Sequence, residues 1–156
     1  MTAWDLSGRR ALVTGAAQGI GAGIAAALRA AGARVTGLDR RAGPDCIGCD
    51  LADPGQIGPA VDRAAERLGG IAILVNNAGI NEKRGLAEID LAHVDRLIAV
   101  NLRAPILVAQ AALAHMGQGG RIVNIASELA FLGRAQASVY AATKGALLSL
   151  TPLLGA

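Results

Sequence analysis

The sequence predicts an α/β fold built on a doubly wound parallel sheet, and three observations support that prediction. Apolar runs of strand length alternate with helical segments of ten or more residues along the chain. Hydrophobic residues make up 53% of the 156 residues and charged residues only 17%, as expected for strands that are covered on both faces. Glycine and polar residues follow directly after the strand-like runs, where ligands bind in such sheets.

The first half of the chain predicts three strands and two helices. Each strand is a short apolar run, and the first helix is rich in alanine. The second helix begins with Asp53 and Pro54, because aspartate is a good N-cap residue and proline fits the first helical turn. The expected strands are 10–15, 34–39 and the weaker run "DCIGCD", and the expected helices are 20–32 and about 53–68.

The second half predicts two more strands and two more helices. The run "IAILVNNAG" is long, continuous and apolar, as a buried central strand should be. Asp90 is expected to cap a long helix after the loop "INEKRGLAEI". The expected strands are 71–79 and 120–127, and the expected helices run from Leu91 to about Met116 and over 138–151. Such alternation implies right-handed crossovers, and the length favours a single domain over residues 1–156.

Composition and charge argue against nucleic-acid and membrane binding. The net charge of +3 comes mainly from arginines that form no basic tract, and aromatic residues are only 2% of the chain. Nucleic-acid binding instead favours a basic face and stacking aromatic residues. No uninterrupted apolar run reaches the roughly 18 residues of a membrane helix, and the N-terminal segment lacks the features of a signal peptide. We therefore expect a soluble, cytoplasmic protein.

The cysteines and histidines do not predict a metal site. Cys46 and Cys49 form a single C-x-x-C pair, and no second Cys or His pair lies at a spacing that would complete a structural zinc site. A redox-active dithiol is an alternative, but the pair falls on a short predicted strand, which favours buried thiols. His93 and His115 lie in the long helix without partners at metal-ligand spacing, so we expect no metal.

A glycine-rich turn follows the first strand and opens the first helix. In "TGAAQGIG", Gly15, Gly19 and Gly21 keep this turn free of side chains. A pyrophosphate group can then approach backbone N–H groups at the helix N-terminus. The spacing is G-x3-G-x-G, and its place between a strand and a helix favours dinucleotide binding over an ordinary turn. Gln18, within the turn, brings no positive charge.

Asp39 ends the second strand, 18 residues after Gly21. A carboxylate at this position accepts hydrogen bonds from the ribose hydroxyls of an adenosine and repels a 2′-phosphate. The neighbouring Arg40 and Arg41 are able to bind such a phosphate, so NADP stays an alternative, but the balance favours NAD. Asp50, after the third strand, is expected to reach the adenine or else to cap its loop.

Five sequence elements, taken in order, resemble the classical short-chain dehydrogenase/reductase family. They are "TGAAQGIG", "NNAG" at 76–79, Asn101, Ser127 and "YAATK" at 140–144. The resemblance covers the whole chain and implies a Rossmann-like NAD(P)-binding domain. It also implies an oxidoreductase that transfers a hydride between NAD(H) and a small-molecule secondary alcohol or ketone. The family further implies a homo-oligomer in which the long helix and the helix at 138–151 pack against another subunit.

Tyr140 and Lys144 form the expected acid/base pair. They lie four residues apart on a predicted helix, so their side chains share one face. A tyrosine at its ordinary pKa is almost entirely protonated at neutral pH, and a nearby cation lowers the pKa of such an acid. Tyr140 is therefore the candidate general acid/base, and the resemblance implies that Lys144 also binds the nicotinamide ribose. Ser127, at the end of the fifth strand, is expected to orient the substrate oxygen toward Tyr140.

Asn101 lies within the long helix, where asparagine is a poor helix former. Pro105 comes four residues later and has no N–H group, so the helical hydrogen bond to the carbonyl of Asn101 cannot form. We expect this carbonyl to bind a water that leads from Lys144 toward solvent, the proton-relay role that the resemblance implies for this asparagine. A kink without such a role is the alternative.

The candidate site residues follow from these motifs. Gly79 lets the backbone approach the ribose on the nicotinamide side, while Asn76 and Asn77 are expected to tie neighbouring strands together. The catalytic candidates are Asn101, Ser127, Tyr140 and Lys144. The cofactor-binding candidates are Gly15, Gln18, Gly19, Ile20, Gly21, Asp39, Asp50, Leu51, Asn77, Ala78, Gly79, Tyr140 and Lys144.

The resemblance also implies segments that this sequence does not contain. Family members continue with a sixth strand, a turn that holds the nicotinamide carboxamide, a substrate-covering segment and a seventh strand. We therefore expect five strands, with the last two family strands missing through truncation or frameshift, and an open edge at the fifth strand. A catalytically inactive dinucleotide-binding fragment is the alternative to an active enzyme. The apolar run "LAFLG" after Ser127 favours a hydrophobic carbonyl compound as substrate.

Overall fold

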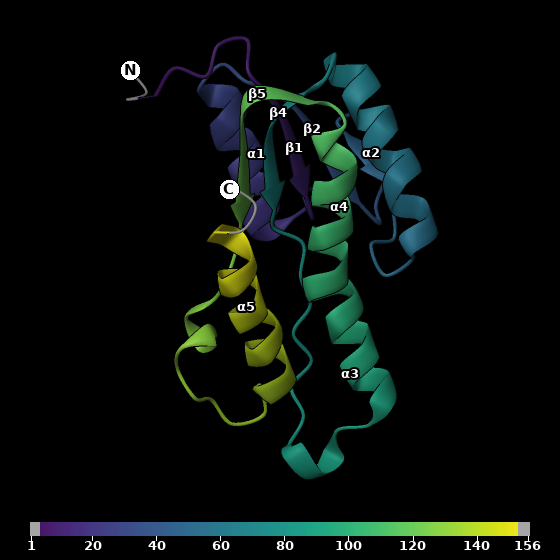
Figure 1. The fold of residues 1–156 in the computed structure, drawn as a ribbon, viewed down its shortest axis with the longest axis vertical. Coiled ribbons are helices and arrows are strands. Elements are labelled where there is room, and N and C mark those ends of the chain that lie inside the picture. Colours follow the sequence, from purple (N-terminus) through teal and green to yellow (C-terminus); the bar gives the residue numbers. More distant parts are fainter. Residues whose placement is uncertain (1–3, 153–156) are drawn as a thin grey trace.

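The computed structural model describes residues 4–152, which form a parallel sheet with helices on both faces (Figure 1). The strand order is β3-β2-β1-β4-β5, and all neighbouring strands are parallel. The chain moves outward from β1 to β3 and then returns to β4 on the other side of β1, which is the predicted doubly wound arrangement. The strands are β1 Arg10–Thr14, β2 Arg34–Asp39, β3 Cys46–Gly48, β4 Ile71–Asn76 and β5 Met116–Asn124.

The helices cover the two faces of the sheet separately. Residues of α1 pack with Val13 and Val35 on one face, whereas residues of α2 and α4 pack with Leu12 and Leu38 on the other. Successive residues of a strand point to opposite faces, so both sets of side chains are buried. The helices are α1 Gly19–Ala30, α2 Pro54–Leu68, α3 Leu91–Ile98, α4 Ala104–Leu113 and α5 Ser138–Leu150.

The ends of α2 follow the prediction closely. Oδ1 of Asp53 accepts a hydrogen bond from the backbone N–H of Gly55 at 2.9 Å, which caps the first turn. At the other end, Gly69 has a φ of +79°, in the left-handed region that glycine adopts most readily. Both ends are therefore determined by local sequence.

The predicted long helix is one continuous helical stretch, but it changes from α-helix to π-helix and back to α-helix. After α3, residues Ala99–Arg103 form a π-helical segment that leads into α4, and α4 ends at Leu113 rather than near Met116. Pro105 cannot donate a helical hydrogen bond, and the wider π turn accommodates this missing donor. The same segment carries Asn101, whose side chain is fully buried.

β4 is shorter than predicted. It ends at Asn76 rather than at residue 79. The backbone N–H groups of Asn77 and Ala78 both donate to the hydroxyl of Thr14, each at 3.0 Å, so the chain turns away from the sheet there. This turn brings the residues after β4 over the end of β1.

β5 is shifted toward the N-terminus relative to the prediction. It spans Met116–Asn124 instead of 120–127, and its register against β4 changes between Ile71 and Ile73. Such an irregularity inserts extra residues on one strand, and here it takes up part of the glycine-rich segment at 117–120. β5 forms an edge of the sheet in the described part of the chain, as predicted.

The helical stretch Leu91–Leu113 is long and apolar enough to cross a membrane, judged by length and composition alone. The sequence analysis considered only uninterrupted apolar runs, and charged residues such as Asp95, Arg96 and Arg103 interrupt this stretch. In the fold this stretch packs against the sheet, α2 and α5, as the core helix of a soluble protein does. Burial within the domain therefore explains part of its apolar character.

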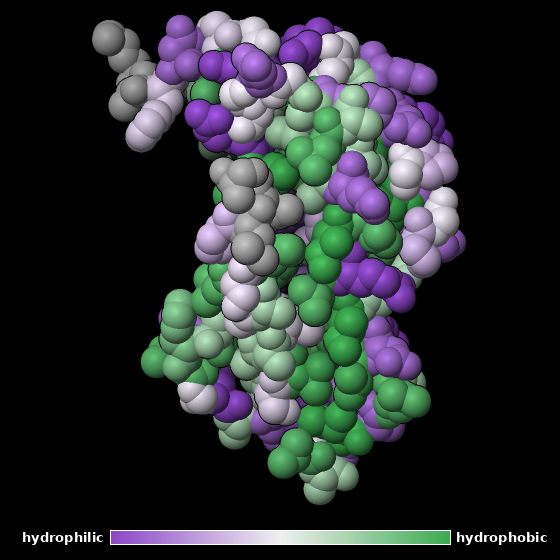
Figure 2. All heavy atoms as spheres, in the orientation of Figure 1, coloured by the Kyte–Doolittle hydropathy of each residue, from purple (hydrophilic) through white to green (hydrophobic). Residues whose placement is uncertain are grey.

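Part of this long helix nevertheless exposes apolar side chains. Hydrophobic residues gather along α3 and α4 beside α5 (Figure 2). A groove of about 500 Å³ lies there, between the long helix and the start of α5. Its apolar lining includes Leu86, Ile89, Val94, Ile98, Leu102 and Val139.

Candidate active site

A cavity of about 540 Å³ lies at the carboxyl ends of the strands. Its walls come from the glycine turn after β1, the end of β2, the loop after β3 and the loop after β4. Every cofactor-binding candidate except Tyr140 and Lys144 lines it. These lining residues are Gly15, Gln18, Gly19, Ile20, Gly21, Asp39, Asp50, Leu51, Asn77, Ala78 and Gly79.

The glycine turn is closely packed at one position and open at another. A Cβ atom on Gly21 would lie 2.0 Å from the carbonyl oxygen of Gly15 and 2.4 Å from Nδ2 of Asn77. Gly19 has a φ of +54°, and no atom lies within 4 Å of the place where its Cβ would be. α1 begins at Gly19, and no side chain caps its first turn. The turn thus leaves space and backbone donors for an anionic group, which fits the pyrophosphate of a dinucleotide.

Asp39 is anchored beside the glycine turn by backbone groups. Its Oδ2 accepts a hydrogen bond from the N–H of Ala17, and its Oδ1 accepts one from the N–H of Arg41, both at 3.1 Å. The guanidinium of Arg41 donates to Oε1 of Gln18 at 2.7 Å. Each carboxylate oxygen keeps capacity for a further donor, as ribose hydroxyls would require.

Asn76 and Asn77 connect strands, as the sequence suggested. Nδ2 of Asn76 donates to Oδ1 of Asn124 at 2.9 Å, which joins β4 to β5. Nδ2 of Asn77 donates to the carbonyl of Thr14 at 2.9 Å, which joins the end of β4 to β1. Asn77 therefore both joins two strands and lines the cavity.

Asn101 holds the loop after β4 with its side chain. Oδ1 accepts from the N–H of Ile80 at 2.8 Å, and Nδ2 donates to the carbonyl of Ile80 at 2.9 Å and to Oγ1 of Thr143 at 3.2 Å. The carboxamide therefore links three elements: the π segment, the loop after β4 and α5. Its role as a proton relay through the main-chain carbonyl stays a prediction.

Lys144 is buried at the inner end of the site. It is 3% exposed, and its Nζ donates to the carbonyl of Ile125 at 2.7 Å and lies 5.9 Å from the centre of the Tyr140 ring. A Cβ atom on Gly79 would lie 3.5 Å from this Nζ, so Lys144 borders the loop that lines the cavity. Burial lowers the pKa of the Lys144 ammonium group. The predicted pairing of Tyr140 and Lys144 on one face of α5 is thus present.

Ser127 lies beyond the end of β5 at Asn124, not at the strand end as predicted, and it caps a short 3₁₀ turn, Glu128–Ala130. Its Oγ accepts a hydrogen bond from the N–H of Leu129 at 3.2 Å. That turn packs against α5, which carries Tyr140. Among residues 4–152, no hydrogen bond joins the hydroxyls of Ser127 and Tyr140. Ser127 also keeps its hydroxyl hydrogen for another acceptor, as a substrate oxygen would be.

Several residues of the cavity wall were not among the candidates. They lie in the loop after β4 and in the helical stretch that follows it: Ile80, Glu82, Arg96 and Val100. Arg96 and Val100 lie four residues apart on one helical stretch, so both side chains share a face. That spacing is the sequence signal that could have predicted their joint place on the cavity wall. Arg40, Cys49 and Ala52 also line the cavity, near Asp39 and Asp50.

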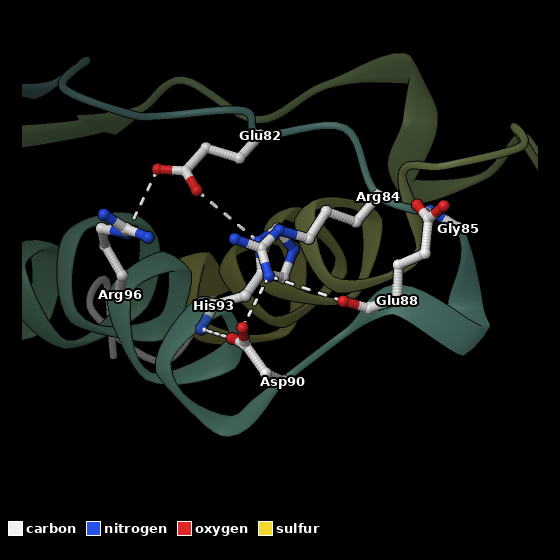
Figure 3. A network of polar contacts seen from close by, with 7 residues as sticks. All are labelled: Glu82, Arg84, Gly85, Glu88, Asp90, His93 and Arg96. Atoms are coloured by element: carbon white, nitrogen blue, oxygen red, sulfur yellow. Dashed lines mark hydrogen bonds and ion pairs between the residues drawn. The ribbon is translucent and has the colours of Figure 1, made fainter.

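Glu82 belongs to a polar network at this wall (Figure 3). Its Oε1 lies 3.2 Å from Nε of Arg96, and its Oε2 lies 3.6 Å from Nδ1 of His93. His93 is 2% exposed, and its Nδ1 has no hydrogen-bond partner among the described residues. Arg84 bonds to Asp90 at 2.8 Å in the same network. The loop after β4 is therefore attached to α3 by charged groups.

The remaining cysteines and histidines have ordinary surroundings. Cys46 and Cys49 are free thiols, and burial is the main cause that raises the pKa of each. His115 lies on the surface with its Nε2 2.7 Å from Oδ1 of Asp62. In the described ranges, no group of three His, Cys, Asp or Glu side chains is placed to hold a metal ion.

Comparisons with known proteins agree with this architecture. The sequence profile of the family described as short chain dehydrogenase matches residues 9–156. A sorbitol dehydrogenase from Cereibacter sphaeroides is 38% identical over 165 residues, which cover 96% of this chain and 64% of that protein. An L-xylulose reductase from Bos taurus is 39% identical over 163 residues, which cover 96% of this chain and 65% of the reductase.

A solved structure gives the same result in three dimensions. A short chain dehydrogenase from Burkholderia cenocepacia J2315, in complex with NADP, is 43% identical and has a TM-score of 0.89. The match covers 94% of this chain and 66% of that one. The chain thus spans just under two thirds of the length of these relatives.

Proposed function

Because this chain belongs to the short-chain dehydrogenase family, we propose that it transfers a hydride between a nicotinamide dinucleotide and a secondary alcohol or ketone. The observation that carries the proposal is the place of the Tyr140–Lys144 pair. Lys144 borders Gly79 at one end of a cavity whose other end holds the glycine turn and Asp39. The cavity therefore offers an adenosine end and a reactive end.

The binding residues divide along this cavity. The turn at Gly19 and the N-terminus of α1 would hold the pyrophosphate through backbone N–H groups. Asp39 would accept hydrogen bonds from the adenosine ribose, and Asp50 would lie near the adenine. Gly79 and Lys144 would border the ribose on the nicotinamide side.

Four residues would perform the proton chemistry. When bound, the nicotinamide supplies the hydride acceptor or donor. Tyr140 would take the hydroxyl proton of the alcohol, or return it to the ketone oxygen, as general acid/base. Ser127 would orient that oxygen by a hydrogen bond. Lys144 favours the ionised phenolate by its charge, and the main-chain carbonyl of Asn101 would hold a water that passes protons to solvent.

The cofactor is proposed to be NAD(H). Both oxygens of Asp39 are held toward the cavity by backbone N–H groups, and a fixed carboxylate disfavours a 2′-phosphate. Two observations favour NADP instead: Arg40 lines the cavity, and the solved relative from Burkholderia cenocepacia binds NADP. Parallel titrations with NADH and NADPH decide between the two cofactors.

The substrate is proposed to be a polyol or the matching ketose. The support comes from the two relatives named above, a sorbitol dehydrogenase and an L-xylulose reductase. Charged groups at Glu82 and Arg96 on the cavity wall suit a hydroxyl-rich molecule. This proposal replaces the hydrophobic carbonyl compound that the run after Ser127 suggested.

The protein is proposed to act as a cytoplasmic homo-oligomer. The apolar groove between the long helix and α5 would pack against a second copy of the chain, as the family resemblance implies. Contiguous apolar surface of this kind is typical of protein interfaces. The free thiols of Cys46 and Cys49 suit a reducing compartment.

The proposed reaction is tested with Tyr140→Phe, which removes one hydroxyl and keeps the ring. The purified chain is titrated with NADH and NADPH by calorimetry and is then assayed against a panel of polyols and ketoses. We expect the variant to lose roughly 10²–10⁴-fold in kcat, the usual contribution of a general acid/base. The Kd for the cofactor should change by no more than about twofold to threefold, since adenosine binding dominates it.

Turnover that survives in Tyr140→Phe would contradict the assigned role. The alternative function is a dinucleotide-binding chain without activity, and the observation that favours it is that the adenosine-side candidates line the cavity whereas Tyr140 and Lys144 do not. Tight cofactor binding without turnover of any substrate by the unmodified chain would support that alternative.

A further inference from the structure

We infer that Thr143 is a positioning residue for this reaction. Its hydroxyl couples the turn of α5 that carries Tyr140 to the carboxamide of Asn101, and through it to the backbone of Ile80 on the cavity wall. The inference rests on the proposed hydride transfer, but the coupling itself can be measured without turnover.

The hydrogen bonds of Thr143 have a defined direction. Oγ1 lies 2.7 Å from the carbonyl oxygen of Tyr140 and 3.2 Å from Nδ2 of Asn101. A hydroxyl has a single hydrogen, and a carbonyl can only accept, so that hydrogen goes to Tyr140. Oγ1 therefore accepts from Asn101. Thr143 is 3% exposed, so water does not compete for these bonds.

This direction fixes the orientation of the Asn101 carboxamide. Asn101 is fully buried, and its two N–H groups point to Thr143 and to the carbonyl of Ile80. Its Oδ1 faces the N–H of Ile80. If the amide were flipped, oxygen would face oxygen at Ile80, and Thr143 would have no hydrogen left to donate. The threonine hydroxyl thus favours the orientation in which both backbone groups of Ile80 are bonded.

The network ends at the reactive part of the cavity. Ile80 lines the cavity directly. A Cβ atom on the preceding Gly79 would lie 3.4 Å from Oδ1 of Asn101 and 3.5 Å from Nζ of Lys144. Loop and lysine are therefore in close contact, and a shift of the loop would alter the distance between the cofactor and Tyr140.

A hydroxyl at residue 143 also acts on the helix itself. A threonine that bonds back to a carbonyl one turn earlier bends a helix slightly. Here the accepting carbonyl belongs to Tyr140, so the bond acts directly on the residue proposed to meet the substrate. Removal of the hydroxyl would relax this turn and leave one N–H of Asn101 unpaired in the interior.

The test compares Thr143→Val, which keeps the shape but removes the hydroxyl, with Thr143→Ser, which keeps the hydroxyl. We expect the valine variant to lose roughly 10–100-fold in kcat, because misplacement of about 1 Å has effects of that order. Its KM for the cofactor should change less than about threefold, since the adenosine end is untouched. The serine variant should retain kcat within about threefold. Thr143→Ala replaces the valine variant if that one does not fold.

Amide hydrogen exchange at Ile80 provides the readout that needs no turnover. We expect protection at Ile80 to fall by roughly tenfold or more in Thr143→Val and to persist in Thr143→Ser. If the unmodified chain has no activity, the proposed function fails while the exchange experiment still tests the coupling. Unchanged protection at Ile80 in the valine variant would overturn the inference. Equal losses in the valine and serine variants would do the same.

Discussion

At the scale of single residues, the site is held mainly by bonds between side chains and backbone. Lys144 donates to the carbonyl of Ile125, and Asn101 bonds to both backbone groups of Ile80. Backbone groups of buried elements have few alternative positions, so these bonds fix the side chains firmly. The part of the site around Lys144 and Asn101 is thus built from residues far apart in sequence.

Among the glycines of residues 4–152, Gly21 has the most crowded position for a Cβ atom. Gly21→Ala would place a Cβ atom 2.0 Å from the carbonyl oxygen of Gly15, and backbone must move to relieve the clash. We expect a loss of about 1–3 kcal/mol in the free energy of unfolding, as overpacking usually costs. Cofactor affinity should fall as well, because the turn would be displaced. Urea unfolding and NADH titration measure both effects.

Gly23 is the matched control on the same helix. It is exposed, and no atom lies within 4 Å of the place for its Cβ. Gly23→Ala should raise the free energy of unfolding by up to about 1 kcal/mol, since alanine is the better helix former. Equal destabilisation by both substitutions would contradict the steric account of Gly21.

At the scale of elements, α3 depends on a charged N-cap. Oδ1 of Asp90 accepts a hydrogen bond from the N–H of His93 at 2.7 Å, and Oδ2 lies 2.8 Å from Nη1 of Arg84. The backbone bond from His93 first, and then Arg84, hold the pKa of Asp90 below its ordinary value of 3.8. The cap matters for function because α3 supplies one wall of the cavity.

This cap predicts a dependence of stability on pH. Because the folded-state pKa of Asp90 is lowered, the unfolded chain binds more protons than the folded chain between the two pKa values. The stabilisation is therefore complete above pH 3.8 and is lost as the pH falls through the folded-state pKa. Asp90→Ala should lower the Tm at pH 7 and show a smaller decrease of Tm toward acid. An unchanged acid dependence in the variant would rule out this contribution from Asp90.

Element boundaries were predictable where a local signal set them. Asp53 and Gly69 delimit α2 as expected, because an N-cap aspartate and a left-handed glycine act within one turn. The ends of β4 and β5 were not predictable. β4 ends where the hydroxyl of Thr14, more than 60 residues earlier, accepts hydrogen bonds from the N–H groups of Asn77 and Ala78. The π segment at Asn101 was foreseen only as a missing hydrogen bond at Pro105.

At the scale of the whole molecule, the site lies where the strand order reverses. β1 and β4 are neighbours in the sheet although β2 and β3 come between them in sequence. This crossing brings Gly15 after β1 next to Asn77 and Ala78 after β4. The cavity is therefore a consequence of topology, as expected for open parallel sheets.

The apolar groove makes a prediction about assembly. Ile98 lies in this groove and is 39% exposed. Ile98→Glu would place a charge in an apolar contact, so we expect the unmodified chain to self-associate and the variant to shift toward monomer. Analytical ultracentrifugation measures the difference. Trp4→Glu is the control, because Trp4 is 76% exposed and lies outside the groove.

A chain that is monomeric at all accessible concentrations would contradict the proposed interface. Equal effects of the two substitutions would contradict it as well, because general surface charge would then explain the change. The groove would in that case be an apolar surface without a second copy.

The sequence alone determined the fold class, the glycine turn and the Tyr140–Lys144 pair. Each depends on a local pattern: alternation of apolar segments, glycines between a strand and a helix, and a spacing of four on a helix. The tertiary structure decided which residues from distant segments share the cavity wall, such as Glu82 and Arg96, and how Thr143 reaches Asn101. These contacts depend on how α3, α5 and the loop after β4 pack together, and no local spacing encodes that packing.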